Sequence, residues 1–322
     1  MADLSVSYLG LKLKTPVIAG SSTLTYSKEN IEKLNQTRAG AIVIKSLFEE
    51  ELAKSSFIQD SFHPESYEYE ISDASVLYGS KRYLDLIKDA KKVSKIPIFG
   101  SINCLGGKWW TDFAIECENS GADAIEVNIS FIPFDYRQNP REVEQKYFDT
   151  VSAVKSKLKI PLSVKIGSNF TNIPYMVYQL KQAGADGVVL FNRYYKVNID
   201  LEKMEYMPAD VYSRREEAYS VLRWVSVVSK DVDIDISAST GVDSGDVALK
   251  YIAAGAKTVQ MVSKLYRDGF GAIDKTVDEI DEFLNLRNFT SVTDIHHKFR
   301  VKDDVNRLER IQYMKIANNQ FF

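Results

Sequence analysis

Lysine and asparagine side chains recur where short apolar runs of this chain end. Lys45 follows AIVI, Lys165 lies in PLSVKIG and Asn128 lies in AIEVNIS. Asn103 and Asn192 follow two other apolar runs. A buried lysine costs free energy unless it is paired or meets an anionic ligand, and asparagine both donates and accepts hydrogen bonds. A flat ring system with amide-like edges would use all five side chains.

Small residues follow the last two apolar runs. Ser239, Thr240 and Gly241 come directly after VDIDISA, and Val262 and Ser263 come directly after AGAKTVQM. Backbone N–H groups at such strand-to-helix turns are open to an anion. Barrel proteins commonly bind phosphate after their seventh and eighth strands. A phosphate there, beside a ring over the barrel mouth, predicts flavin mononucleotide (FMN).

Eight apolar runs alternate with helix-like stretches and must position these side chains. The runs lie at 15–20, 38–46, 96–102, 120–130, 161–167, 183–192, 232–239 and 254–263. The helix-like stretches lie at 27–38, 81–94, 108–119, 141–158, 174–183, 213–229 and 244–254, with one more near 271–287. The apolar runs lack strict alternation, as strands buried on both faces do. The count predicts an α/β fold, a (β/α)8 TIM barrel; another parallel α/β fold is the alternative.

Two connections are too long for plain barrel loops. Residues 47–79 and 193–212 are rich in tyrosine and acidic residues, and each follows a predicted strand. We therefore expect inserted rim segments after strands two and six, serving either function or a subunit interface. One domain is expected over 1–322, with 288–322 as a helical C-terminal extension.

The composition argues against several classes of protein. The net charge is −3, which offers no reason to expect nucleic acid or an anionic membrane as a partner. With three histidines and two cysteines, no metal site is expected. We also expect a cytoplasmic protein, because no signal peptide and no apolar run of membrane-spanning length is visible.

At these residues the sequence resembles the dihydroorotate dehydrogenase family, as a divergent member of its soluble, class 1-like branch. The resemblance covers about residues 5–270. It is carried by the order and spacing of Ala-Gly-Ser at 19–21, Ile-Lys-Ser at 44–46, Asn-Ile-Ser at 128–130, Val-Lys-Ile at 164–166 and the serine/glycine turn at 237–245. It implies an FMN-dependent dehydrogenase that acts on CH–CH bonds and converts dihydroorotate to orotate in pyrimidine biosynthesis.

The resemblance also implies roles for single residues. Lys45, Ser130 and Lys165 would be catalytic, and Lys45, Asn128 and Asn192 would contact the substrate. The residues implied to bind FMN are Ala19, Gly20, Ser21, Lys45, Ser46, Asn103, Asn128, Lys165, Ser239, Thr240, Gly241, Val262 and Ser263. Fumarate is the soluble electron acceptor that the branch suggests, and a homodimer is the expected assembly.

One position departs from the family pattern. The family places a cysteine or serine base after Asn-Leu-Ser, and this chain has Phe131 there, which cannot accept a proton. Ser130 or Cys104 could replace the base. Alternatively, the flavin site is kept and the substrate is another small molecule. A third alternative is a flavin- or phosphate-binding barrel without turnover.

Overall fold

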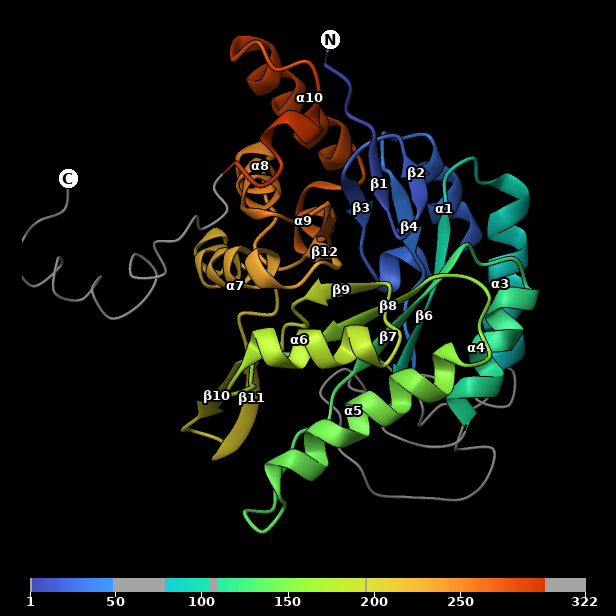
Figure 1. Cartoon of the computed structure of the whole chain (residues 1–322), viewed down its shortest axis with the longest axis vertical. Helices are drawn as coiled ribbons and strands as arrows, with labels where there is room; N and C mark the ends of the chain where they lie inside the picture. Colours follow the sequence, from blue (N-terminus) through green and yellow to red (C-terminus); the bar gives the residue numbers. More distant parts are fainter. Residues whose placement is uncertain (1, 49–78, 105–108, 195, 299–322) are drawn as a thin grey trace, which may run out of the picture.

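A computed structural model describes residues 2–48, 79–104, 109–194 and 196–298 (Figure 1). Most of the predicted rim segment at 47–79 therefore lies outside the described residues. The same holds for the predicted C-terminal extension beyond residue 298.

Eight parallel strands form a closed barrel at the centre of the molecule. They are β3 (Val17–Ala19), β4 (Ala41–Val43), β6 (Ile98–Cys104), β7 (Ala124–Ile129), β8 (Leu162–Ile166), β9 (Gly187–Leu190), β12 (Asp235–Ala238) and β13 (Thr258–Met261). Their order around the sheet is β4-β3-β13-β12-β9-β8-β7-β6, and a direct pairing of β4 with β6 closes the ring. The predicted TIM barrel is confirmed; seven of the strands lie within one of the eight apolar runs each, and β6 extends two residues beyond the run 96–102. A short strand β5 (Leu47–Phe48) also pairs with the end of β6.

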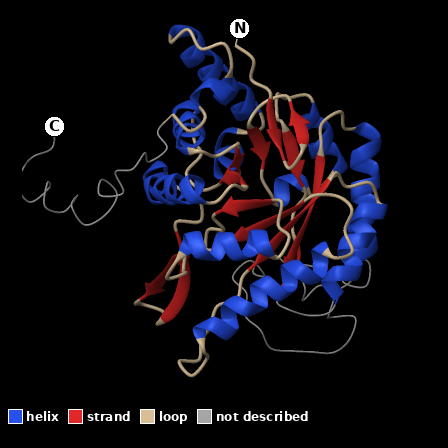
Figure 2. Cartoon of the chain, in the orientation of Figure 1, coloured by secondary structure: helices blue, strands red, loops and turns tan. Residues whose placement is uncertain are grey.

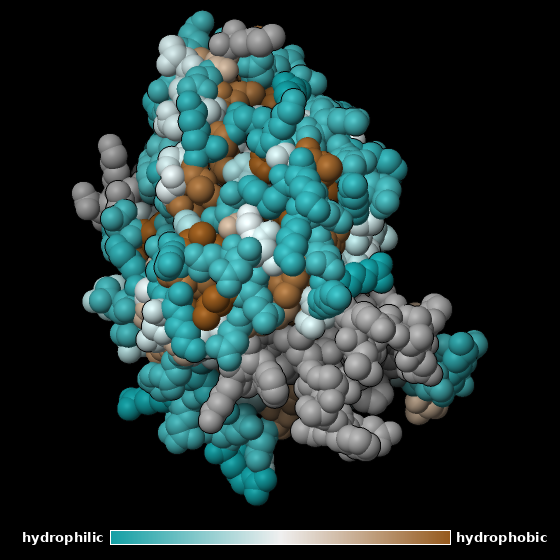
Figure 3. Space-filling view, turned by 90° about the vertical axis from the view of Figure 1, so that its right-hand side faces the viewer, coloured by the Kyte–Doolittle hydropathy of each residue, from teal (hydrophilic) through white to brown (hydrophobic). Residues whose placement is uncertain are grey.

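Helices surround this barrel, as Figure 2 shows. They are α1 (Lys28–Asn35), α3 (Gly79–Val93), α4 (Trp109–Asn119), α5 (Pro140–Lys155), α6 (Ile173–Gln182), α7 (Ala218–Asp231), α8 (Gly245–Ala254), α9 (Ser263–Asp268) and α10 (Gly271–Leu286). Asparagine caps start two of them, because the side chains of Asn139 and Asn172 accept backbone N–H groups of α5 and α6. The helical face seen in Figure 3 is mainly hydrophilic, as amphipathic helices packed on a barrel require.

The strands are buried on both faces, which explains their continuous apolar character. All six residues of β7 and all five of β8 are buried. Alternate residues of these strands are polar and point inward, so the barrel interior holds Ser101, Glu126, Ser163 and Gln260 as well as aliphatic side chains. Most of the barrel interior is therefore apolar core. The polar side chains in it lie beneath the carboxyl ends of the strands.

Two antiparallel hairpins add to the barrel. The first, β1 (Val6–Tyr8) with β2 (Leu11–Leu13), covers the amino-terminal end, where the Leu9 N–H donates to Asp235 Oδ2 (2.7 Å). The second, β10 (Lys196–Asp200) with β11 (Glu205–Ala209), follows β9 and projects away from the barrel in Figure 1. It occupies the segment 193–212, where a long rim insertion was predicted.

The first residues of the predicted C-terminal extension pack against the body. Ser291 bridges to Asp3, and the short 3-10 helix η5 (Val292–Ile295) buries Val292. Two other 3-10 helices, η1 (Thr23–Thr25) and η4 (Arg215–Glu217), lie near the barrel mouth. In the described part of the chain, no helix is both long and apolar enough to span a membrane.

Candidate active site

The carboxyl ends of the barrel strands enclose a cavity of about 170 Å³. Its walls are built from residues that follow six of the eight strands, together with residues of the 210–213 loop and of α9. The lining residues are Ser21, Ser22, Thr23, Lys45, Ser46, Phe48, Asn128, Lys165, Asn192, Val211, Tyr212, Val262, Ser263 and Tyr266. Eight of the predicted site residues are therefore together around one cavity: Ser21, Lys45, Ser46, Asn128, Lys165, Asn192, Val262 and Ser263.

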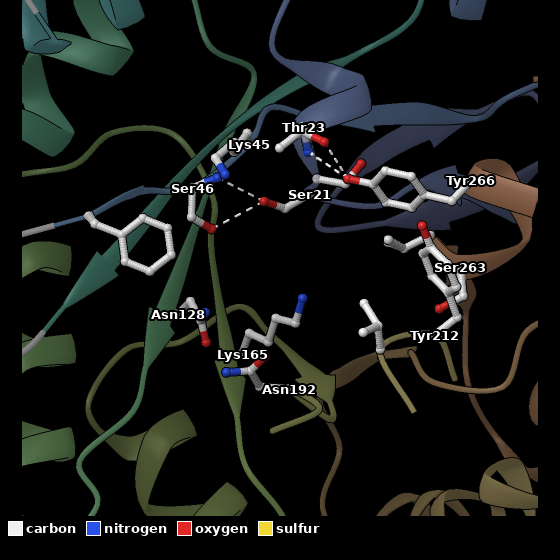
Figure 4. A pocket seen from close by; sticks show the side chains of 14 residues that line it. Ser21, Thr23, Lys45, Ser46, Asn128, Lys165, Asn192, Tyr212, Ser263 and Tyr266 are labelled. Carbon is white, nitrogen blue, oxygen red and sulfur yellow. Dashed lines mark hydrogen bonds between the residues drawn. The ribbon is translucent and has the colours of Figure 1, made fainter. Parts of the chain in front are cut away.

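Lys165 forms the floor of this cavity. It leaves the inward face of β8, is almost fully buried, and directs its ammonium group toward the cavity centre in Figure 4. Among the described residues it pairs with Glu126 on the neighbouring strand β7, with 3.9 Å between Lys165 Nζ and Glu126 Oε1. The other carboxylate oxygen of Glu126 accepts a hydrogen bond from Gln260 Nε2 (2.5 Å). A buried glutamate thus compensates part of the positive charge of the site.

The opposite wall is a chain of serine hydroxyls beside Lys45. Ser46 Oγ lies 2.8 Å from Ser101 Oγ and 3.1 Å from Ser21 Oγ, and the Ser46 N–H donates to Ser21 Oγ (2.8 Å). These bonds join the ends of β3 and β4 to the middle of β6 and fix the backbone at Lys45. Lys45 itself is buried, and its ammonium lies 6.0 Å from the centre of the Phe48 ring.

Two asparagines stand side by side on adjacent strands. Asn103 of β6 and Asn128 of β7 are register partners, and both are buried. Within the described residues, neither Oδ1 atom has a hydrogen-bond partner. Buried amide oxygens are normally paired, so these two are suited to bind a ligand. Asn128 lines the cavity, whereas Asn103 lies beside it.

The predicted phosphate turn has an unusual backbone. Thr240 and Gly241 both have positive φ, 78° and 72°, which is rare for a β-branched residue such as threonine. The Tyr251 hydroxyl donates to the Thr240 carbonyl (2.8 Å) and holds the turn. The Gly241 N–H donates to Ser213 Oγ (3.1 Å), and that hydroxyl donates to Ser263 Oγ (3.0 Å). Ser213 therefore connects the loops after β12 and β13.

The remaining predicted residues lie around the cavity rather than in its wall. Ala19 and Gly20 end β3 beside β13, where the Gly20 N–H donates to the Met261 carbonyl (3.0 Å). Ser239 lies at the end of β12, just before the Thr240 turn.

The end of β7 holds the position that departs from the family pattern. Phe131 packs its ring edge-on against Tyr147 of α5 at 5.0 Å, and its N–H donates to the Tyr147 hydroxyl (3.0 Å). It is not among the cavity-lining residues. Ser130 is buried, and its hydroxyl donates to the Tyr194 hydroxyl oxygen (3.2 Å). Cys104 ends β6, and its side chain lies outside the described atoms.

Aromatic residues complete the cavity and were not predicted. Tyr212 and Tyr266 have ring centres 5.4 Å apart at one end of it, and the Thr23 N–H donates to the Tyr266 hydroxyl (3.1 Å). Ser213 and Phe48 were likewise missed. These four residues lie in loops or short elements beyond the strand ends. The signal for Phe48 and Tyr212 in the sequence was the number of aromatic residues in the long connections, and Ser213 and Tyr266 had no such signal.

Comparison with known proteins identifies the family to which this chain belongs. The family model described as dihydroorotate dehydrogenase matches residues 78–284, which is well over half of the chain. The chain belongs to the dihydroorotate dehydrogenase family. Members of this family are oxidoreductases that act on CH–CH bonds. The family membership predicted from the sequence is confirmed.

Curated relatives match the chain along nearly its whole length. A protein of Thermoplasma volcanium named "Dihydroorotate dehydrogenase B (NAD(+)), catalytic subunit" is 26% identical over 309 residues, covering 92% of this chain and 98% of its own. A protein of the same name from Bacteroides fragilis is 28% identical over 301 residues, covering 92% and 98%. A protein of Aeropyrum pernix, whose name includes "dihydroorotate dehydrogenase A (fumarate)", is 26% identical over 311 residues, covering 91% and 96%.

Proposed function

We propose that the protein is an FMN-dependent oxidoreductase with dihydroorotate as its nominal substrate, serving pyrimidine biosynthesis. The observation that carries the proposal is the convergence of Lys45, Lys165, Asn128 and Asn192 on one cavity at the carboxyl ends of the strands. Two lysines suit a ring that becomes anionic on reduction, and asparagines suit its amide edges.

The residues fit the cofactor on structural grounds. The Oδ1 atoms of Asn103 and Asn128 are buried and unpaired within the described residues, and both could accept a ring N–H. Gly20 lets the end of β3 pack against Val262, which lines the cavity, because a Cβ at position 20 would lie 2.7 Å from Val262 Cγ2. When bound, the flavin would supply hydride transfer. Ala19, Gly20, Ser21, Ser46, Asn103, Asn128 and Lys165 would hold its ring.

The phosphate would be held by the two loops that Ser213 connects. Ser239, Thr240 and Gly241 follow β12, and Val262 and Ser263 follow β13. The successive left-handed residues at 240 and 241 suit a turn that offers backbone N–H groups to an anion. Because the Gly241 N–H already donates to Ser213 Oγ, binding of a phosphate requires this hydroxyl either to join the site or to move.

Purification of the full chain tests the cofactor directly. The visible spectrum should show the two absorption bands of oxidised flavin, and released cofactor should co-elute with FMN. A colourless protein that takes up no FMN on reconstitution would contradict the proposal. Anaerobic addition of dihydroorotate should then bleach the flavin. Fumarate is the proposed acceptor, since one relative is named for it, and it should restore the colour.

A second candidate is a flavin oxidoreductase for another small cyclic substrate. Three aromatic residues, Phe48, Tyr212 and Tyr266, line the cavity and favour a less polar ligand. Titration with orotate separates the two candidates, because tight binding supports the pyrimidine substrate and absence of binding supports the alternative.

The proposed assembly is a homodimer that uses the β10–β11 hairpin. This hairpin exposes large apolar side chains on both strands, among them Val197 (68% exposed) and Tyr206 (82% exposed). A projecting hairpin of this kind is typical of a surface that is covered in an assembly.

A further inference from the structure

Both ends of the β10–β11 hairpin lead into the wall of the cavity. Asn192 lies shortly before β10, Val211 lies shortly after β11, and both residues line the cavity. Tyr212 follows Val211 and lines the cavity as well, as Figure 4 shows. The backbone at the base of the hairpin therefore determines where this part of the wall lies.

Arg193 holds the base of the hairpin together. Its Nη2 donates to the Asp210 carbonyl (2.6 Å), and its Nη1 donates to the Val211 carbonyl (3.2 Å). Its Nε and Nη2 also donate to the Glu217 carboxylate, at 2.8 and 3.2 Å. Only 15% of the Arg193 side chain and 19% of the Glu217 side chain are exposed, so water competes little for these charge-assisted hydrogen bonds. One side chain thus joins the segment after β9 to the end of the hairpin and to η4.

The bend at Asp210 depends on such contacts. Its φ is 48°, a conformation that residues other than glycine rarely adopt. Its carboxylate accepts a hydrogen bond from Arg214 Nη2 (2.5 Å) and lies 3.6 Å from Lys196 Nζ, while its carbonyl is bound by Arg193. This bend turns the chain from β11 into the 210–213 loop. Loss of the Arg193 contacts would therefore release the loop.

Ser213 connects this loop to the predicted phosphate turns. Its N–H donates to Ser263 Oγ (2.9 Å), and its carbonyl accepts a hydrogen bond from Arg267 Nη1 (3.1 Å). Its hydroxyl, as described above, lies between the Gly241 N–H and Ser263 Oγ. A displacement of the 210–213 loop would therefore change the contacts of the turns after β12 and β13.

Arg193 is suited to position the loop rather than to bind an anion itself. Its hydrogen bonds use every guanidinium nitrogen, and all of them go to oxygen atoms of the protein. Burial opposes the ionisation of Glu217, but hydrogen bonds from Arg193 and from the Arg214 N–H keep the pKa of this carboxyl below its usual range. At neutral pH the two side chains therefore form a charge-compensated ion pair.

Resting on the proposed function, we propose that Arg193 and Glu217 are positioning residues for the flavin phosphate, because they hold the 210–213 loop with Ser213 between the turns after β12 and β13. Binding of FMN then depends on the ion pair, whereas binding of a flavin without phosphate does not. Loosening the loop lowers the fraction of apoprotein that is competent to bind phosphate, and FMN affinity falls by the same factor.

The experiment compares Arg193→Gln with Arg38→Gln. Arg38 is a matched control, because its guanidinium also donates to a backbone carbonyl, that of Asp274 (2.7 Å), and to the carboxylate of Asp278. It precedes β4 and lies at the opposite end of the barrel. Each apoprotein is titrated with FMN and, separately, with riboflavin, which lacks the phosphate. Quenching of flavin fluorescence gives the dissociation constants.

We expect Arg193→Gln to weaken FMN binding by about tenfold or more, the effect of removing charge-assisted hydrogen bonds, and to leave riboflavin binding within about threefold of wild type. Glu217→Gln should weaken FMN binding similarly. The double variant should lose no more affinity than either single variant, because the two side chains act as one unit. Arg38→Gln should leave the affinity for both flavins unchanged.

The outcomes separate this inference from the proposed function. A wild-type apoprotein that binds neither flavin overturns both. Wild-type FMN affinity in Arg193→Gln, or equal losses for FMN and riboflavin, overturns the inference alone. Equal losses in Arg193→Gln and Arg38→Gln, or a wild-type protein that binds the two flavins equally well, also overturn it. If Arg193→Gln does not fold, Glu217→Gln is judged by the same outcomes.

Discussion

Glu126 and Lys165 form a buried ion pair beneath the candidate active site, with 3.9 Å between Glu126 Oε1 and Lys165 Nζ. Glu126 is only 1% exposed, and within the described residues its Oε1 atom has no hydrogen-bond partner. The pair is therefore held by charge rather than by a close hydrogen bond. A lysine arranged in this way has a weak internal partner and remains able to attract an anionic ligand from the cavity.

We predict that Glu126→Gln lowers the free energy of unfolding by about 3 kcal/mol, because it leaves the Lys165 ammonium buried without its counter-charge. The substitution keeps an oxygen that can accept the Gln260 hydrogen bond, so shape is nearly unchanged. Saturating reduced FMN should recover more stability in the variant than in wild type, since the negative charge of the reduced ring would meet an uncompensated lysine. Urea unfolding with and without FMN measures both effects.

Ser237→Ala is the control for Glu126→Gln, because Ser237 is also buried in the barrel with an unpaired Oγ among the described residues. It should change stability by less than about 1 kcal/mol. A Glu126→Gln protein as stable as wild type would mean that Lys165 does not depend on this carboxylate.

We predict that Gly241→Ala destabilises the protein more than Gly269→Ala. Both glycines have positive φ, 72° at Gly241 and 75° at Gly269, and Gly269 combines it with a ψ of −178°. A Cβ at Gly241 would lie 2.9 Å from Ala218 Cβ and from the Arg214 carbonyl oxygen, whereas at Gly269 it would meet nothing within 4 Å. Gly269→Ala should therefore cost about 2 kcal/mol from backbone strain alone, and Gly241→Ala about 4 kcal/mol, because contact with its neighbours is added to the strain.

FMN affinity provides a second test of the role of Gly241. If the turn after β12 holds the phosphate, Gly241→Ala should weaken FMN binding at least tenfold, and Gly269→Ala should leave it unchanged. Isothermal titration of the apoprotein measures this. Equal FMN affinity in the two variants would place the phosphate elsewhere.

If the β10–β11 hairpin forms the dimer interface, charged substitutions on it should break the dimer. Ile199 and Tyr206 are register partners on β10 and β11, and both side chains are exposed. Replacing both with lysine should convert the dimer to a monomer in sedimentation velocity, while stability changes by less than about 0.5 kcal/mol because both positions are on the surface. Lysines at Phe283 and Leu286, exposed apolar residues of α10, are the control and should leave the dimer intact. A wild-type monomer at micromolar concentrations counts against the assignment.

The sequence predicted the barrel well, because buried parallel strands have a clear signature. Runs such as AIEVNIS and PLSVKIG consist of residues that must be buried on both faces, and each contains one barrel strand. The β10–β11 hairpin within 193–212 was not predicted, although an inserted segment was expected there. Its alternating KVNID pattern was present, but the segment is exposed on both sides, so no core face supported the prediction.

The candidate site was predictable only where strands carry it. Asn128 and Lys165 lie among the last residues of strands and Lys45 and Asn192 just after strands, and the barrel geometry alone brings these positions to one end. The contact of Tyr194 with Ser130 beside this cavity wall could not be predicted from the sequence, because Ser130 follows β7 and Tyr194 follows β9, with Gly167 after β8 packed against the tyrosine. The orientation of Phe131 depends in the same way on Tyr147, which lies on a helix that follows it.

Stability should fall on mild acidification because of His296. Burial lowers the pKa of this side chain from its usual 6.5 to about 4, with His297 and Lys257 adding to the effect, although its Nε2 lies 3.1 Å from the Gly255 carbonyl oxygen. Because the folded state disfavours the protonated form, the unfolded chain binds more protons between these values. The contribution is complete above pH 6.5 and is lost as the pH falls toward about 4.

We expect this residue to account for about 1 kcal/mol of the stability lost between pH 7 and pH 5, after allowance for its partial exposure. His296→Gln keeps an N–H that can donate to the Gly255 carbonyl but does not titrate. Its free energy of unfolding should therefore fall less steeply over this interval than that of wild type, as measured by urea unfolding at both pH values. Parallel pH dependence in the two proteins would show that His296 is protonated equally in the folded and unfolded states.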